Sequence, residues 1–273
     1  MKKKWLAAIA TLALGALVLT GCGKQKETTL TVGASSTPHA EILKHVQPQL
    51  KKEGVNLKIK TFQDYVLPNK ELASGDLDAN YFQHKPFLDN WNKKNHGTLV
   101  SAGNVPLEPI GFYSKKYKKL SDLPNGATIL VSNNVADYGR VLQILKDAGL
   151  ITLKPGTKIE SANFNDIQTN KKNLKFKTDL EPKLMTQFYK RGEGDAVVIN
   201  ANYAVQAGLN PKKDSIALEK NSSPYANLIA VQKKNKNNPA IKKLVKALQS
   251  KSTQQWINKH YNGGVVAVYP NGK

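Results

Sequence analysis

The sequence predicts an α/β protein, and three observations support this prediction. Stretches with the alternating apolar pattern of strands are followed by stretches with the period of helices, in a repeating order. The length allows two modest domains, because about 250 of the 273 residues remain once an N-terminal leader is removed. A short turn of glycine and acidic residues occurs twice, each time between a helix and a strand.

The first 21 residues have the pattern of a secretory signal peptide. Lysines at positions 2–4 precede an apolar run, residues 5–19, that is rich in alanine and leucine. This run is shorter than the ~20 apolar residues that a membrane-spanning helix needs. It ends in Leu19-Thr20-Gly21-Cys22, which resembles a bacterial lipobox, and Cys22 is the only cysteine. The resemblance implies cleavage before Cys22 and diacylation of its thiol; the alternative is a plain signal peptide followed by a stray cysteine.

The N-terminal part of the remaining chain predicts strands and helices in alternation. Val55–Lys60 alternates with period two, as a half-buried strand does, and Pro38 falls in the first turn of a helix, where proline is tolerated. The predicted strands are residues 29–34, 55–60, 78–83, 98–102 and 110–113, and the predicted helices are residues 38–52, 68–74 and 85–95.

The C-terminal part continues the same order. A helix that begins near residue 138 has apolar side chains at i, i+3, i+4 and i+7, namely Tyr138, Val141, Leu142 and Leu145. Gly208 ends another helix. The predicted strands are residues 127–132, 195–200 and 227–231, and the other predicted helices are residues 182–191, 203–207, 241–248 and 253–261.

The repeated turn is the sequence's one internal echo. Gly75-Asp76-Leu77-Asp78-Ala79 follows a helix and opens a strand, and Gly192-Glu193-Gly194-Asp195-Ala196 does the same. Two lobes of similar topology would produce this echo. Chance similarity between short turns is the alternative.

The basic charge does not indicate nucleic-acid binding. Removal of residues 1–21 takes away three lysines and lowers the formal net charge from +21 to +18. Only Arg140 and Arg191 are arginines, whereas nucleic-acid readers rely on arginine for bidentate base contacts. The scattered lysines are typical of a solvated surface beside an anionic membrane or wall polymer. We expect no nucleic-acid partner.

No motif of a known catalytic or metal site is present. The chain lacks G-x-S-x-G, H-E-x-x-H and a Walker-type loop, and its single cysteine excludes an internal disulfide. His39 and His45 are six residues apart on one predicted helix, so they face different directions. We therefore predict no catalytic residue, metal or cofactor. A lipid-anchored enzyme with dispersed catalytic residues, and an adhesin that uses the basic surface, are the remote alternatives.

Two segments are unusual for a plain surface. Asp78–Phe87 has three aromatic residues and a histidine at a strand-to-helix junction, where ligands bind in α/β sheets; ordinary core aromatics are the alternative. Val131–Arg140 places an arginine in the first turn of a helix, where a cation is unfavourable unless an anion is bound. In a chain that otherwise uses lysine, Arg140 suggests bidentate capture of a carboxylate; a surface arginine is the alternative.

These segments belong to a longer series that resembles a known family. The most specific are ANYFQHKPFL, residues 79–88, and SPYANLI, residues 223–229. The full series is Thr31–Ala34, Pro38–Leu43, Asp78–Phe87, Gly139-Arg140, Val198–Asn200, Ala207–Leu209, Ser223–Ile229 and Asn262–Gly264. In these segments, and over essentially the whole chain after the leader, the sequence resembles the NlpA-type lipoproteins, the methionine-binding components of ABC importers.

The resemblance implies a two-lobed, type II periplasmic-binding-protein-like fold with a ligand cleft between the lobes. After a tether, residues 22–28, the expected lobes are residues 29–107 plus 228–273 and residues 108–227. It also implies a monomer, anchored by Cys22 at the extracytoplasmic face of the membrane, that delivers L-methionine, and D-methionine as a further candidate, to an ABC permease and its ATPase.

The resemblance also supplies a map of the site. The residues expected to line the pocket for the ligand side chain are Tyr65, Phe82, His84 and Phe87. Arg140 is expected to bind the α-carboxylate, and Asn200 and Asn227 to bond the α-amino and carboxylate groups. Such an apolar pocket with a few polar groups is typical of small-molecule sites.

One loop departs from the family pattern. The family usually has Asn-Asp-Pro-Thr/Ser-Asn before the Gly-Arg pair, and this chain has Asn133-Asn134-Val135-Ala136-Asp137-Tyr138. The loop beside the expected carboxylate site is therefore rebuilt. Another apolar amino acid, or a small methionine-containing peptide, remains an alternative ligand.

Overall fold

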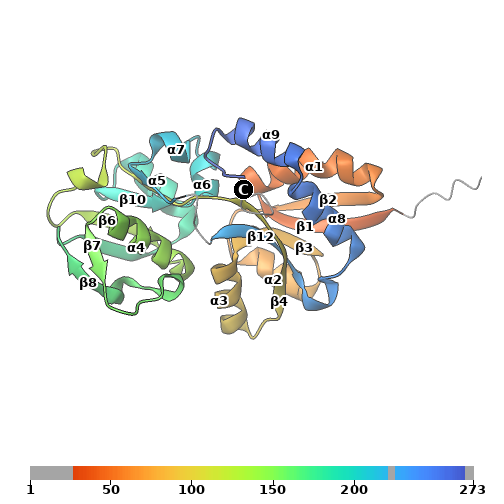
Figure 1. Cartoon of the computed structure of the whole chain (residues 1–273), viewed down its shortest axis with the longest axis horizontal. Helices are drawn as coiled ribbons and strands as arrows, with labels where there is room; N and C mark the ends of the chain where they lie inside the picture. Colours follow the sequence, from red (N-terminus) through yellow and green to blue (C-terminus); the bar gives the residue numbers. More distant parts are fainter. Residues whose placement is uncertain (1–26, 221–224, 268–273) are drawn as a thin grey trace, which may run out of the picture.

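The computed structural model describes residues 27–220 and 225–267, which form two five-stranded sheets set side by side (Figure 1). The leader, Cys22 and the Ser223-Pro224 pair of the SPYANLI motif lie outside the described residues. No helix in the described part of the chain is long and apolar enough to cross a membrane.

The first sheet has the strand order β2-β1-β3-β12-β4. Its strands are β1 (Thr28–Ser35), β2 (Val55–Phe62), β3 (Ala79–His84), β4 (Leu99–Leu107) and β12 (Ala226–Gln232). β1 pairs in parallel with β2 and β3, whereas β12 is antiparallel to β3 and β4. The strand that completes this sheet therefore comes from the C-terminal part of the chain.

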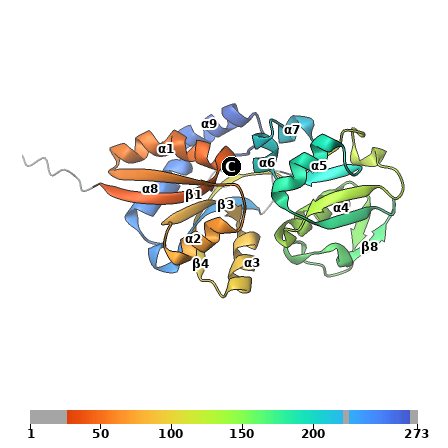
Figure 2. The same cartoon turned by 180° about the vertical axis from the view of Figure 1, so that it is seen from behind.

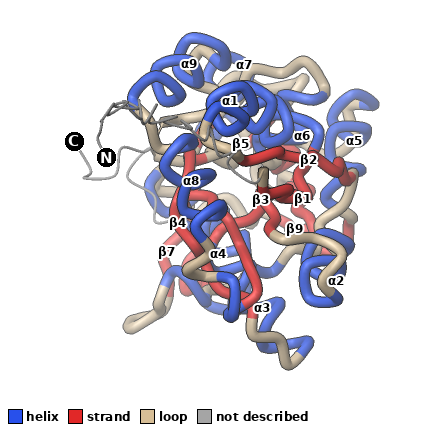
Figure 3. Tube along the Cα trace, turned by 90° about the vertical axis from the view of Figure 1, so that its right-hand side faces the viewer, coloured by secondary structure: helices blue, strands red, loops and turns tan. Residues whose placement is uncertain are grey.

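Helices cover both faces of the first sheet. They are α1 (Glu41–Lys52), α2 (Leu67–Ser74), α3 (Lys85–Asn95), α8 (Pro239–Leu248) and α9 (Lys251–Tyr261). Leu43 of α1 and Leu244 of α8 belong to the core on one face, and Leu72 of α2 and Leu88 of α3 to the core on the other. Figure 3 shows this layering, with α1 and α9 above the strands and α2 and α3 below.

The second sheet has the strand order β11-β5-β10-β6-β9. Its strands are β5 (Gly111–Tyr113), β6 (Thr128–Ser132), β9 (Lys175–Leu180), β10 (Ala196–Ile199) and β11 (Ala217–Leu218). The helices are α4 (Tyr138–Asp147), α5 (Met185–Arg191), α6 (Ala201–Gln206) and α7 (Pro211–Asp214), and a separate hairpin joins β7 (Ile151–Leu153) to β8 (Ile167–Asn170). The α4 side chains pack on one face, and those of α5 and α6 on the other.

The two sheets have the same topology. In each, three parallel strands are followed by one antiparallel strand and then an edge strand. The chain passes from the first sheet to the second between β4 and β5, and it returns between β11 and β12. The result is the two-lobed α/β architecture that the sequence predicts. From behind, Figure 2 shows α6 at the junction, where it lies against the turn η1 (Ser36–Ala40) of the first lobe.

The repeated turn has the same role in each lobe. The backbone N–H of Thr31 in β1 donates to the Asp78 carboxylate at 2.8 Å, and the N–H of Thr128 in β6 donates to the Asp195 carboxylate at 2.8 Å. In return, the N–H of each aspartate donates to the carbonyl of the same threonine. The internal echo is therefore a structural equivalence, and the second acidic residue of each turn, Asp78 or Asp195, fixes the start of its strand against the neighbouring strand.

The predicted elements are present with small shifts in their bounds. The helix predicted at residues 38–52 begins as α1 at Glu41, because η1 occupies the preceding residues. Strands β7, β8, β9 and β11 have no counterpart among the predicted elements. All four are short strands at an edge of their sheet or in the separate hairpin.

Candidate functional site

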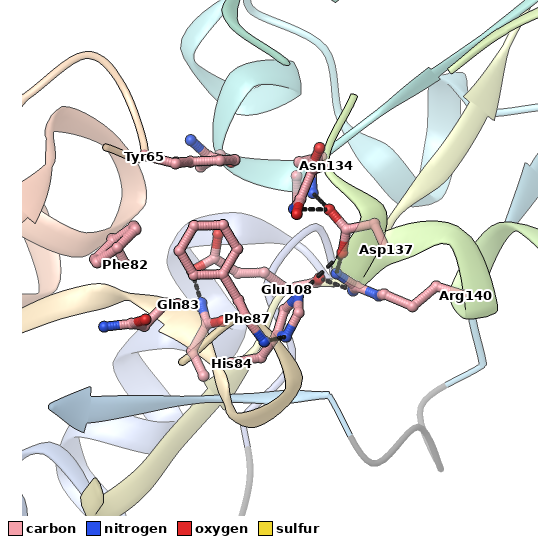
Figure 4. Close-up of a pocket in the computed structure, with 13 residues that line it drawn as sticks. Tyr65, Phe82, Gln83, His84, Phe87, Glu108, Asn134, Asp137 and Arg140 are labelled. Atoms are coloured by element: carbon pink, nitrogen blue, oxygen red, sulfur yellow. Dashed lines mark hydrogen bonds and ion pairs between the residues drawn. The ribbon is translucent and has the colours of Figure 1, made fainter. Parts of the chain in front are cut away.

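A small cavity lies between the two lobes (Figure 4). Residues of both lobes and of the crossing segments line it. All seven residues that the sequence analysis assigns to the ligand line this one cavity: Tyr65, Phe82, His84, Phe87, Arg140, Asn200 and Asn227.

Aromatic side chains of the first lobe form one wall. The ring centroids of Phe82 and Phe87 are 5.7 Å apart, and that of Tyr65 lies 5.9 Å and 6.0 Å from them. Phe82 comes from β3, Phe87 from the first turn of α3, and Tyr65 from the loop after β2. Such a wall offers an apolar, polarizable surface to a ligand side chain.

His84 connects this wall to the charged side of the cavity. It is the N-cap of α3, and its Nδ1 accepts the backbone N–H of Phe87 at 3.3 Å. A nitrogen that accepts has no proton in the neutral ring, so the proton lies on Nε2. Nε2 then donates across the cleft to Oδ1 of Asp137 at 3.0 Å. The hydrogen bond that caps α3 thus fixes the tautomer of His84 that can donate to Asp137 in the other lobe.

Asp137 is the centre of the charged wall, and the sequence analysis named it only as part of the loop that departs from the family pattern. Its carboxylate is 1% exposed and accepts four hydrogen bonds. Oδ1 accepts from His84 and from Nη1 of Arg140, at 3.0 Å each. Oδ2 accepts from Asn134 at 2.6 Å and from Asn200 at 2.9 Å. Both oxygens are therefore saturated by donors of the protein itself.

These contacts set the charge of Asp137. Burial alone would raise the pKa of this carboxyl, because it penalises the ionised form. The hydrogen bond from His84 and the positive charge of Arg140 outweigh burial and hold the pKa of Asp137 well below its usual range. Asp137 is thus ionised at neutral pH, inside a nearly closed site.

Arg140 has partners on both segments that cross between the lobes. Its guanidinium is 3% exposed; Nε donates to the Glu219 carboxylate at 3.0 Å, and Nη2 donates to the Glu108 carbonyl at 2.7 Å and to the same Glu219 carboxylate. The Tyr225 ring lies 5.2 Å away. The first-turn cation therefore has anions of its own chain, Asp137 and Glu219, as neighbours.

The glycine before Arg140 allows this arrangement. A Cβ atom at Gly139 would lie 1.8 Å from the carbonyl oxygen of Ile159 and 3.1 Å from the Tyr225 hydroxyl. Any side chain would force α4 away from these neighbours. Gly139 thus allows α4 to pack closely against Ile159 and Tyr225, and this close packing positions Arg140 at the cavity.

Glu108 and Asn202 are further lining residues that the sequence analysis did not assign. Oε1 of Glu108 accepts from Nε2 of His39 at 2.6 Å and from Nδ2 of Asn227 at 2.7 Å. Oδ1 of Asn202 accepts from the Tyr65 hydroxyl at 2.6 Å. The available sequence signals were weak: Glu108 is the first residue of the second expected lobe, and Asn202 stands two residues after an assigned asparagine.

A wider hollow opens from this cavity toward solvent. It shares Tyr65, Phe87 and Asn134 with the cavity. Its rim includes Val66 and Leu67 from one lobe and Val135 from the other, the large hydrophobic side chains that are exposed in the described structure. Within residues 27–220 and 225–267, no group of three or more histidine, cysteine or acidic side chains could hold a metal ion.

Comparisons with known proteins give a consistent family. The family model described as NlpA lipoprotein matches residues 30–269. The methionine-binding lipoprotein MetQ of Bacillus subtilis (strain 168) is 47% identical over 273 residues, which cover 98% of this chain and 99% of that protein.

Solved structures agree. A nutrient binding protein from Burkholderia cenocepacia, bound to methionine, has a TM-score of 0.82 at 46% identity, and the match covers 88% of this chain and 100% of that one. A YaeC-family lipoprotein and pheromone cOB1 precursor from Enterococcus faecalis V583 has a TM-score of 0.86 at 58% identity, with coverages of 88% and 100%.

The lowered pKa of Asp137 predicts an acid-dependent stability. A carboxyl whose pKa is lowered by folding stabilises the protein above its unfolded pKa of about 3.9, and this contribution is lost as the pH falls below that value. Asp137→Asn should therefore lower the free energy of unfolding by a constant amount between about pH 5 and 7, and by less below about pH 4. Urea unfolding across this range measures the difference.

Asp89→Asn is the matched control, because Asp89 is exposed and pairs only with Lys85 on the same helix. Its effect should be small at every pH. An Asp137→Asn difference that stays constant down to about pH 3 would contradict the lowered pKa.

Proposed function

Because the chain belongs to the NlpA lipoprotein family, we propose that it is the substrate-binding protein of an ABC importer and that its ligand is methionine. The observation that carries the proposal is the cavity between the lobes, in which an aromatic wall faces a charged wall. A solved relative at 46% identity is bound to methionine. The proposed activity is capture and delivery, with no chemical step.

The aromatic wall suits a thioether. A sulfur atom near an aromatic ring gains ~0.3–1.5 kcal/mol per contact, and an unbranched side chain adapts to the gaps between rings. We propose that Tyr65, Phe82 and Phe87 contact the ligand side chain, with His84 at the edge of the wall. The wider hollow beyond Tyr65 favours one second candidate, a small methionine-containing peptide that extends toward solvent.

The polar end of the ligand would meet Arg140, Asn200 and Asn227. Asn200 and Nη1 of Arg140 now donate to Asp137, so a ligand carboxylate reaches them only in exchange for that side chain. Truncation of Arg140 is a poor test, since it leaves Asp137 and Glu219 as unpaired buried charges at a cost of about 3–5 kcal/mol in stability. A change in the ligand, in place of a change in the protein, tests the contact with Arg140 without altering the stability of the fold.

The rest of the proposal concerns the membrane. Diacylation of Cys22 would anchor the mature chain at the extracytoplasmic face, beside a permease and its ATPase, and two acyl chains make such attachment durable. The family description and the name of the Bacillus subtilis relative, both lipoproteins, support this location.

We also propose that residues 29–107 plus 228–273 and residues 108–227 move as two lobes around the crossing segments. The separate hydrophobic cores of the two sheets support this division. Contacts across the cleft include the bond from the Tyr203 hydroxyl to the Gln63 carbonyl at 3.1 Å and that from Tyr65 to Asn202. Loss and gain of such contacts would open and close the site.

Calorimetry on protein stripped of ligand by partial unfolding tests the ligand assignment. Methionine should bind, norleucine should bind more weakly, and glutamine and histidine should hardly bind, because the wall offers no partners for their polar groups. Methionine amide should bind roughly 30-fold more weakly or worse, since a desolvated charge contact is worth about 2 kcal/mol or more. An amide that binds within about threefold of methionine means that Arg140 stays with Asp137, and the carboxylate assignment is then wrong.

The anchor is tested with Cys22→Ser. The variant should be exported without lipid and without cleavage after residue 21, because the serine hydroxyl does not replace the thiol in lipidation. Detergent phase partitioning and intact mass distinguish the two forms. A serine variant that still partitions with the detergent contradicts the lipid anchor.

Small-angle scattering tests the closure of the lobes. Saturating methionine should reduce the radius of gyration of stripped protein by a small amount. Superimposable scattering curves with and without methionine, on protein shown by calorimetry to bind it, would count against lobe movement.

A further inference from the structure

We propose that Glu108 is the residue that receives the ligand's ammonium group, and that it thereby restricts the site to ligands with a free amine. The inference deepens the proposed function and rests on it. Neither the family resemblance nor the comparisons assign a role to this residue.

The argument begins with the three carboxylates around the cavity, which differ in what they can still bind. Both oxygens of Asp137 accept two hydrogen bonds each. The Glu219 carboxylate holds Arg140 and also accepts the backbone N–H of Ile110 at 3.1 Å. Either group would have to give up a buried bond to receive a ligand cation.

Glu108 is different. Its two hydrogen bonds, from His39 and Asn227, both end on Oε1. Across the part of the chain that the structure describes, no hydrogen bond or ion pair ends on Oε2 of Glu108. The residue is 7% exposed and lines the cavity, and in Figure 4 it lies between the aromatic rings and Arg140. A carboxylate oxygen with spare capacity, in a residue that lines the cavity, is a strong acceptor for an ammonium group.

Asn202 supplies an independent observation on the same cavity. Its Nδ2 is buried and has no hydrogen-bond partner, while its Oδ1 is held by the Tyr65 hydroxyl. The residue is 3% exposed. Buried polar groups are almost always paired, so an unpaired donor and an acceptor with spare capacity in the lining of one cavity indicate a ligand that has both kinds of group. The ammonium and carboxylate of an amino acid are such a pair.

The charge balance favours a cation as well. Glu108, Asp137 and Glu219 surround a single guanidinium, which pairs with the carboxylates of Asp137 and Glu219, whereas the partner of the Glu108 carboxylate is the imidazole of His39. A surplus of buried negative charge is costly unless a positive group compensates it. A ligand that has lost its ammonium but kept its carboxylate would add to the surplus.

The matched substitution is Glu108→Gln. The amide oxygen can still accept from His39 and Asn227, while an NH₂ group replaces the oxygen that has no partner. This change keeps the volume and the internal bonds and turns one acceptor into a donor. Glu193→Gln is the control, because Glu193 is 46% exposed and its ion-pair partner is Arg191.

Calorimetry of wild type and both variants uses two probes, methionine and 4-(methylthio)butanoate, which is methionine without its amino group. Wild type should prefer methionine by roughly 30-fold or more. Glu108→Gln should weaken methionine binding by roughly tenfold or more and leave the butanoate within about threefold of its wild-type value, or tighten it. Glu193→Gln should change neither.

Three results would overturn the assignment. Glu108→Gln that binds methionine within about threefold of wild type means that the ammonium lies elsewhere, although the proposed function stands. An equal loss for both probes in a folded variant means that Glu108 only shapes the pocket. Wild-type protein that binds neither probe removes the proposed function, and the inference with it.

Discussion

The Arg140 guanidinium is the contact on which the arrangement of the cleft depends. It stands in the first turn of α4 and bonds the carbonyl of Glu108 and the carboxylate of Glu219, one on each segment that crosses between the lobes. Through Asp137 it also reaches His84, which ends β3 in the other lobe. One side chain thus ties a helix, both crossings and the facing lobe together. Its burial is possible because each of its three nitrogens donates to a charged or carbonyl acceptor.

The site is built where strands of both lobes end, and this explains its mixed character. His84 ends β3 and Asn200 follows β10, so both point into the space beyond the carboxyl ends of parallel strands. The first lobe contributes a wall of aromatic rings. The second lobe and the crossings contribute charges that satisfy one another. A ligand with an apolar tail and two charged groups matches this division, whereas a wholly apolar or wholly polar molecule matches only one wall.

Local signals explain which parts were predictable. Phe82, His84 and Phe87 stand together in one short segment, and alternation and capping determine their directions. The repeated turn likewise has a local role. Asp78 and Asp195 each directly precede a strand, and each accepts a hydrogen bond from the strand beside it. Glu108, Asp137 and Asn202 were not assigned, because their roles come from partners far away in the chain: His39 for Glu108, His84 for Asp137 and Tyr65 for Asn202. Strands such as β9 were missed for a similar reason. Its apolar side chains are only Phe176 and Leu180, and neither is fully buried, so its identity comes from pairing with β6.

The order of strands in the first sheet has a consequence for how the chain acquires its structure during synthesis. Within its sheet β4 pairs only with β12, which lies more than a hundred residues later, beyond the whole second lobe. One edge of β3 also pairs with β12, so this edge has no partner strand until β12 has been made. The second lobe can assemble as soon as its own residues are available, but the first remains a three-stranded fragment with a bare apolar edge until almost the entire polypeptide has been made. Such delayed completion keeps the nascent chain loosely folded for most of its elongation.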